Sequence, residues 1–208
     1  MSITTDKAES RRLIVAITGA SGAPYAVRFL QIAVQHYDEI YLAVSEQARQ
    51  VIALETGRSV SFDDQLSDSL LGFHSDVLRL VEKRNYFSPP ASGSFRNDGM
   101  VIVPCSMGTA GRIAGGISDD IVTRAADVCL KERRKLILVP RETPWNLIHL
   151  RNLTTLAEAG ATILPACPGF YHGAKTINDL VDHVVARILQ QLNIEHKLIP
   201  EWQHDEEM

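Results

Sequence analysis

Five short apolar runs along the chain predict the strands of a parallel sheet. The runs are LIVAI (13–17), IYLAV (40–44), MVIV (100–103), LILV (136–139) and ATIL (161–164). None of them alternates apolar with polar residues, which is typical of strands that are covered on both faces. We therefore expect these segments to form the buried centre of one sheet.

Helical spacing fills the intervals between these runs. Ile121, Ala125 and Val128 share one helix face, behind Asp119 or Asp120 as the N-cap.

Two later helices are marked by their end signals. Segment 144–159 opens with Pro144 at a first-turn position and closes at Gly160. Thr176 and Asp179 form a capping-box pattern ahead of the last helix. Strands that alternate with helices imply right-handed βαβ crossovers. The pattern predicts an α/β fold with a doubly wound parallel sheet.

The regular alternation breaks between residues 58 and 99. This region holds the charged stretch VEKRNY and the loop SPPASGSF, and 58–84 predicts no more than a helix. At roughly 150 residues per domain, a length of 208 residues favours a single domain over 1–208. We expect 1–11 and 203–208 to be flexible tails.

Composition narrows the function classes. Twenty-one Lys+Arg against 25 Asp+Glu give a net charge of −4, which argues against non-specific nucleic-acid binding. No apolar run approaches the roughly 18 residues of a membrane span, and the first dozen residues lack the apolar segment of a signal peptide. Cys105, Cys129 and Cys167 show no CxxC spacing and predict reduced thiols in the cytoplasm.

Small-residue loops follow the first and third runs, where an open α/β sheet binds its ligands. TGASG (18–22) offers a tight turn, the Ser21 hydroxyl and the first amides of a helix, which together suit a phosphate monoester. The loop is not GxGxxG, and Ser45 replaces the carboxylate that would bind a ribose. A mononucleotide such as FMN is therefore favoured over NAD, although a tight turn without a ligand would look the same.

The loops after the third and fourth runs add candidates. PCSMGTAG (104–111) is rich in hydroxyls and backbone donors, and Arg141 and Glu142 stand at a strand end. Each of these features, taken alone, could equally be a close-packed turn or a helix start. The acidic pairs Asp63-Asp64 and Asp119-Asp120 lack the third aspartate of a DDxxD cluster, and no zinc spacing or GxSxG elbow occurs. The sequence thus predicts no metal.

Several long motifs together resemble one family. TGASG, PPASGS, PCSMGTAGRIAGGISDD, TRAADVCLKERR, LVPRETPWNLIHLRNL and PACPGFYH are similar to the UbiX flavin prenyltransferases, collinearly from residue 12 to Trp202. The resemblance implies a Rossmann-like three-layer α/β/α fold and a homododecamer with active sites where subunits meet. It implies metal-free transfer of the prenyl group of dimethylallyl phosphate to reduced FMN, whose prenylated product serves UbiD-type decarboxylases.

The resemblance also assigns residues, motif by motif. Met107 stands where many relatives have threonine, and SDD at 118–120 replaces a more usual Asn-containing stretch. Glu55, Glu142 and Ser21 are implied in catalysis, the first two as acid–base carboxylates. The implied flavin contacts are Gly19, Ala20, Ser21, Ser45, Ser106, Met107, Gly108, Thr109 and Arg141. The implied prenyl-donor contacts are Tyr171, Arg187, Arg124, Lys131, Ser92, Gly93 and Trp202.

Physical chemistry is compatible with these roles. Departure of a phosphate without metal needs cations and a proton donor, which Arg124, Lys131, Arg187 and Tyr171 supply if they converge. Without the resemblance, Arg124 and Lys131 would be interpreted as a solvated helix face. Glu55 would likewise be a surface glutamate; in an apolar prenyl pocket, desolvation would instead raise its pKa and suit it to proton transfer.

Two other functions remain as alternatives. An FMN-dependent cysteine-type decarboxylase would share the flavin loops, but it would carry PASANT and PxMNxxMW, which this chain lacks. A non-catalytic flavin carrier would need the glycine loops without Glu55, Tyr171 and Arg187.

Overall fold

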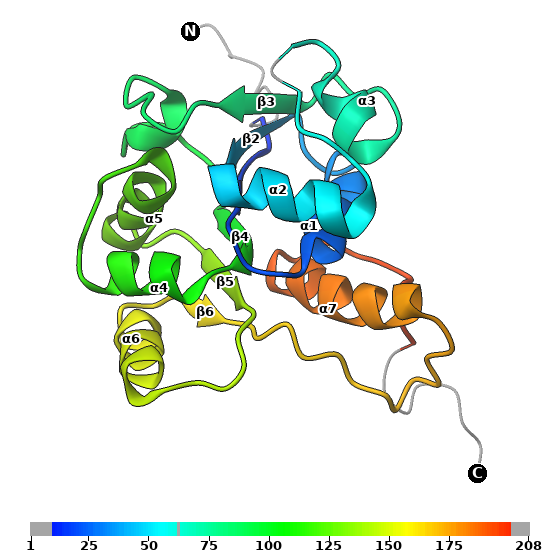
Figure 1. Ribbon diagram of the computed structural model, residues 1–208. Coiled ribbons are helices and arrows are strands. Elements are labelled where there is room, and N and C mark those ends of the chain that lie inside the picture. Colours follow the sequence, from blue (N-terminus) through cyan, green and yellow to red (C-terminus); the bar gives the residue numbers. More distant parts are fainter. Residues whose placement is uncertain (1–9, 62, 201–208) are drawn as a thin grey trace, which may run out of the picture.

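Six parallel strands form one sheet in the computed structural model, which describes residues 10–61 and 63–200 (Figure 1). All five predicted strands are present. The sixth, β3, escaped prediction because the exposed Arg79 interrupts its apolar run. The strands are β1 (Arg12–Ile17), β2 (Glu39–Val44), β3 (Leu78–Val81), β4 (Met100–Cys105), β5 (Leu136–Pro140) and β6 (Thr162–Ile163), in the order β3-β2-β1-β4-β5-β6.

Helices cover both faces of this sheet, as the three-layer prediction requires. Leu13, Val15 and Ile17 of β1 face a core with α1, α2, α3 and α7, whereas Ile14 and Ala16 face a core with α4, α5 and α6. The period of two in a strand produces this division. The helices are α1 (Ala23–Ala33), α2 (Glu46–Thr56), α3 (Leu66–Leu71), α4 (Met107–Ala114), α5 (Ile121–Lys131), α6 (Leu147–Glu158) and α7 (Ile177–Gln191), with a short 3-10 turn at Pro89–Ala91.

The strand order reverses between β1 and β4. The chain moves outward from β1 to β2 and β3, then returns to β4 on the other side of β1. The loops after β1 and β4 therefore diverge to opposite sides, which leaves a crevice at the carboxyl ends of these strands. The TGASG and PCSMG loops lie at this point, as the sequence predicts.

Helix ends follow their capping residues, with one correction. Asp120 caps α5 and Thr176 caps α7, each in a reciprocal capping box. The predicted start at Pro144 is wrong, because α6 begins at Leu147. Asn146 is the cap: its side-chain oxygen accepts the N–H of His149 at 2.8 Å, a bond that proline cannot make.

The predicted tails lie almost wholly outside the described residues, which exclude 1–9 and 201–208. Arg11, placed in the first tail, contacts the body: its backbone N–H donates to Asp38 at 2.8 Å. Its guanidinium lies 4.7 Å from the centre of the Tyr37 ring. Among the described helices, none combines the length and the apolar character that crossing a membrane requires.

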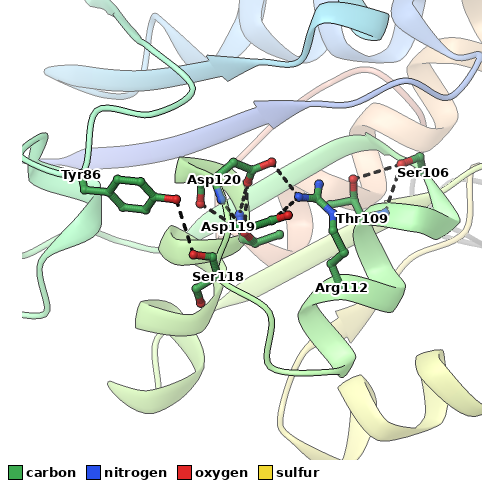
Figure 2. Close-up of polar contacts among 8 residues, drawn as sticks. Tyr86, Ser106, Thr109, Arg112, Ser118, Asp119 and Asp120 are labelled. Atoms are coloured by element: carbon green, nitrogen blue, oxygen red, sulfur yellow. Dashed lines mark hydrogen bonds and ion pairs between the residues drawn. The ribbon is translucent and has the colours of Figure 1, made fainter.

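An ionic contact joins the last turn of α4 to the start of α5 (Figure 2). Arg112 of α4 donates to Asp119 at 2.5 Å and to Asp120 at 2.8 Å. Asp120 also accepts the N–H of Thr123 at 2.9 Å. Burial raises the pKa of Asp120, but the hydrogen bonds from Thr123 and Arg112 and the arginine charge outweigh it, so this pKa lies below its usual value.

Asp120→Ala is expected to destabilise the protein by about 2 kcal/mol, from a lost cap and a lost ion pair that solvent partly screens. Asp119→Ala is the matched control, with an expected loss below about 0.5 kcal/mol because Asp119 is exposed. Urea unfolding of both variants provides the comparison. The carboxylate stabilises the fold above its unfolded-state pKa, so the Asp120→Ala defect should fade as the pH falls below about 4. Equal losses at neutral pH would contradict this account.

Candidate functional site

Thr18 fixes the crevice between the two loops. Its hydroxyl donates to the carbonyl of Pro104 at 2.9 Å and accepts the N–H of Ser106 at 2.7 Å. Thr18 is buried, so both bonds are shielded from water. One side chain thus ties the end of β1 to the start of α4. Thr18 is the first residue of TGASG, and the motif by itself does not reveal this role.

Glu55 reaches the same crevice from the end of α2. Its Oε2 accepts the N–H groups of Gly22 at 2.9 Å and Ala23 at 2.8 Å, at the N-terminus of α1. The hydroxyl of Ser21 also hydrogen-bonds this carboxylate. The expectation that these first amides are available to a phosphate is therefore wrong, because a carboxylate of the chain itself takes them.

The same contacts correct the expected ionisation of Glu55. Burial raises its pKa, but the bonds from Ser21, Gly22 and Ala23 and the charge of Arg141 outweigh burial and place the pKa below its ordinary value. Glu55 is thus an ionised carboxylate at neutral pH, and it is able to accept a proton. The raised pKa expected from the sequence takes desolvation into account, but not the hydrogen bonds that Ser21, Gly22 and Ala23 donate.

The surroundings of Glu55 are not purely apolar. A groove of about 730 Å³ runs beside it between α1, α2 and α7, with Val27 and Ile177 among its walls. Arg28 and Asp182 also line the groove and form an ion pair at 2.6 Å. This groove is therefore of mixed character, and the apolar prenyl pocket that the resemblance implies, with Trp202 as a wall, stays a prediction.

Arg141 brings a positive charge to the crevice from the end of β5. Its Nε donates to the carbonyl of Ser21 at 2.9 Å, and its backbone N–H donates to the carbonyl of Cys105 at 3.3 Å. These bonds link the ends of β5, β1 and β4. Glu142, the next residue, is exposed, and its carboxylate accepts the N–H of Thr143 at 3.1 Å.

The N-terminus of α4 forms the second side of the crevice. Ser106 caps it, accepting the N–H of Thr109 at 3.3 Å, and the two hydroxyls lie 3.0 Å apart (Figure 2). Met107 buries its side chain in the core, which leaves its backbone for the crevice. A Cβ placed on Gly108 would meet no atom within 4 Å. A helix N-terminus with open space before it suits a phosphate group.

The remaining predicted flavin contacts line the β1 and β2 ends. Ser45 caps α2 by accepting the N–H of Ala48 at 3.1 Å. A Cβ on Gly19 would lie 2.6 Å from Cβ of Gln47, so only glycine allows α2 to approach this closely. Ala20 is buried between these loops and Ser21 is exposed.

Tyr171 and Arg187 lie on the α7 side of the sheet. The Tyr171 hydroxyl lies 3.3 Å from Nε2 of His183, a residue of α7 that the sequence analysis missed. Arg187 follows His183 by one helical turn, and its charge is close enough to lower the pKa of that histidine, after burial and His172. The sequence signal that could have revealed His183 is its position within the apolar stripe of the last helix.

The other predicted prenyl-donor residues lie across the sheet. Arg124 and Lys131 belong to α5, on the face opposite α7. Arg124 donates to the carbonyl of Ala91 at 3.1 Å, and Lys131 pairs with Glu132. Ser92 and Gly93 follow the adjacent 3-10 turn; a Cβ on Gly93 would lie 2.8 Å from Nζ of Lys131.

Within the described chain, the predicted prenyl-donor residues therefore form two separate groups. Arg124 and Lys131 do not converge with Tyr171 and Arg187. Trp202 lies outside the described residues. Within residues 10–61 and 63–200, no group of three or more histidine, cysteine or acidic side chains is placed to hold a metal ion.

Comparison with known proteins agrees with this geometry. Residues 1–189 match the family model described as Flavoprotein. The chain is 45% identical over 195 residues to the flavin prenyltransferase UbiX of Pseudomonas aeruginosa, across 92% of this chain and 93% of that protein.

Two solved structures have the same fold. The dodecameric FMN-dependent UbiX-like decarboxylase from Escherichia coli O157:H7 has a TM-score of 0.83 at 42% identity, covering 92% of this chain and 99% of that one. AnUbiX (PadA1), in complex with FMN and dimethylallyl pyrophosphate, also has a TM-score of 0.83, at 39% identity and with 95% and 100% coverage. From its sequence, its strand order and the loops at its crevice, this chain belongs to the UbiX-type flavin prenyltransferase family.

Proposed function

We propose that this chain joins the dimethylallyl group of dimethylallyl phosphate to reduced FMN and so makes prenylated FMN. One observation supports the proposal beyond family membership: an ionised glutamate, Glu55, accepts the N–H groups of Gly22 and Ala23 at the end of the TGASG loop, and the charge of Arg141 helps to lower its pKa. A flavin carrier would not need a carboxylate there. Reduced FMN is the prenyl acceptor and supplies the nucleophilic atoms of its ring system.

We assign FMN binding to the loops that follow β1 and β4. The FMN phosphate is assigned to the N-terminus of α4, where Ser106, Thr109 and the amides of Met107 and Gly108 are grouped. This placement follows from the occupation of the α1 amides by Glu55. Gly19, Ala20, Ser21, Ser45 and Arg141 are proposed to contact the rest of the flavin.

Proton transfer is assigned to Glu55 and Ser21, with Glu142 as a second carboxylate. Formation of the new ring requires loss of a flavin proton and protonation of an alkene carbon. Glu55 is ionised and hydrogen-bonded to the Ser21 hydroxyl, so it is placed to accept the first proton. The hydrogen bonds from Ser21, Gly22 and Ala23, with a smaller contribution from the charge of Arg141, lower the pKa of Glu55 and keep it ionised.

The prenyl phosphate is assigned to Tyr171 and Arg187, with Arg124, Lys131, Ser92, Gly93 and Trp202 completing the site. The two groups of residues lie on opposite faces of one chain, so we propose that neighbouring subunits of a dodecamer combine them. The E. coli relative is dodecameric, which supports this arrangement. A UbiD-type decarboxylase is the proposed recipient of the product.

The cytoplasm is the proposed location. It is supported by three free cysteines among the described residues, Cys105, Cys129 and Cys167. Disulfides are rare in that compartment.

Anaerobic incubation with reduced FMN and dimethylallyl phosphate, followed by mass analysis of the flavin, tests the function. A gain of one prenyl unit supports it. A parallel incubation with dimethylallyl pyrophosphate identifies the preferred donor. Decarboxylation of a peptide with a carboxyl-terminal cysteine, with unchanged flavin mass, would favour the decarboxylase alternative. FMN binding without either reaction would favour the non-catalytic flavin carrier.

Prenyl transfer is expected to continue at an unchanged rate in EDTA. The proposed phosphate-binding groups are protein cations, hydroxyls and amides, so a chelator removes nothing that they need. Initial rates with and without EDTA, at fixed ionic strength because salt screens those cations, are the measurement. Complete loss of activity that magnesium restores would refute the expectation.

A further inference from the structure

His183 makes a directional contact with Tyr171. This histidine is 8% exposed, and its Nε2 lies 3.3 Å from the Tyr171 hydroxyl. The two rings meet edge to face at 5.6 Å between centres. His183 thus contacts Tyr171 and lies one turn before Arg187 on α7, and both of these neighbours are assigned above to the prenyl phosphate.

The backbone of Gly169 determines which nitrogen of His183 donates. The N–H of Gly169 donates to Nδ1 at 3.3 Å, so Nδ1 carries no hydrogen. A neutral imidazole has one donor and one acceptor nitrogen, and Nε2 is therefore the donor. Burial, followed by the charges of His172 and Arg187, lowers the pKa of His183, which agrees with a neutral ring.

Gly169 also provides the space for this contact. A Cβ on Gly169 would lie 2.9 Å from Cε1 of Tyr171 and 3.1 Å from Nε2 of His183. His172 stacks on the His183 ring, with 5.1 Å between the ring centres and an interplanar angle of 18°. His172 is held in turn by a contact of 3.4 Å between its Nε2 and the carbonyl of Asp179. The imidazole is thus fixed from several sides.

We infer that His183 is a positioning residue for Tyr171, and that its Nε2–H donates to the phenol oxygen so that the phenolic O–H is directed to the phosphate of the prenyl donor. The inference rests on the function proposed above. The direction of the bond is essential: an Nε2 acceptor would consume the phenolic hydrogen, whereas an Nε2 donor does not. Tyr171 can then donate to an anion while its ring stays fixed.

A double-mutant cycle tests this inference, with kcat/KM for dimethylallyl phosphate measured on FMN-loaded enzyme. His183→Phe keeps an aromatic ring and removes the donor, and it is expected to lower kcat/KM about three- to tenfold, the worth of one hydrogen bond. In a Tyr171→Phe background the same substitution should change kcat/KM less than about twofold, because the hydroxyl is already absent. His183→Gln retains an N–H donor and should recover most of the rate.

Several results would overturn the inference. A merely structural role would give the same loss in both backgrounds, and a glutamine variant as slow as the phenylalanine variant would show that the donor is irrelevant. FMN titration reports whether each variant is folded; His183→Met, which also lacks the donor, replaces a phenylalanine variant that fails to bind FMN. Absence of product with the unaltered enzyme would overturn the proposed function together with this inference. Additive losses in an active enzyme would overturn the inference alone.

Discussion

Glu55→Gln is expected to slow formation of prenylated FMN by about 10²–10⁴-fold, as loss of a general acid–base group does. The amide has the shape of the carboxylate and can still accept from Gly22 and Ala23, so the α1 N-terminus should remain in place. It cannot accept a proton at neutral pH. Product formation by mass analysis, at matched FMN occupancy, is the measurement.

The pH dependence of Glu55 follows from its lowered pKa. Its carboxylate stabilises the fold above the unfolded-state pKa of about 4.3, and this contribution is lost as the pH falls through the lower folded-state value. At pH 7 the group is ionised and acts first as a base. Glu158→Gln, at the exposed end of α6, is the control and should leave the rate unchanged. A Glu55→Gln enzyme with the unaltered rate would return Glu55 to a structural role as a helix cap.

Gly108→Asp is expected to weaken FMN binding by more than about 100-fold. At about 5 Å and an effective dielectric constant near 20, each pair of like unit charges costs about 3 kcal/mol, and 1.4 kcal/mol is about tenfold in affinity. The site has room for the side chain, since a Cβ there would meet no atom within 4 Å. A carboxylate in the first turn of α4 also agrees with the helix dipole, so the fold should persist.

Gly108→Asn is the matched control, because it has nearly the same shape and no charge. It should bind FMN far more tightly than the aspartate variant, as measured by quenching of FMN fluorescence. Equal affinities of the two variants would place the phosphate elsewhere and contradict the assignment of the α4 N-terminus.

The fold was predictable where one physical signal dominated. The apolar runs from Leu13 to Ile17 and from Leu136 to Val139 are buried on both faces, and burial of this kind leaves a continuous hydrophobic pattern. β3 lacks this continuous pattern because the exposed Arg79 interrupts it. Pro144 does not mark the start of α6, because proline is tolerated in a first turn but does not itself start a helix. Asn146 supplies the capping hydrogen bond at the start of this helix.

The loops of the candidate site can be predicted from the sequence, but the contacts between its residues cannot. Small residues after β1 and β4 mark the crevice because the strand order reverses there. The two hydrogen bonds that Gly22 and Ala23 donate to Glu55 join residues 33 and 32 positions apart, and no local pattern encodes them. These long-range bonds change both the proposed phosphate site and the expected pKa of Glu55.

The most direct test of the account is the mass of the flavin after one anaerobic incubation of the unaltered protein with reduced FMN and dimethylallyl phosphate. Parallel samples omit the prenyl donor or contain Glu55→Gln at equal FMN occupancy. We expect a flavin heavier by one prenyl unit in the complete sample, and unchanged FMN without the donor. We expect little product with the variant. FMN of unchanged mass in the complete sample, from protein that binds the flavin, would contradict the central claim.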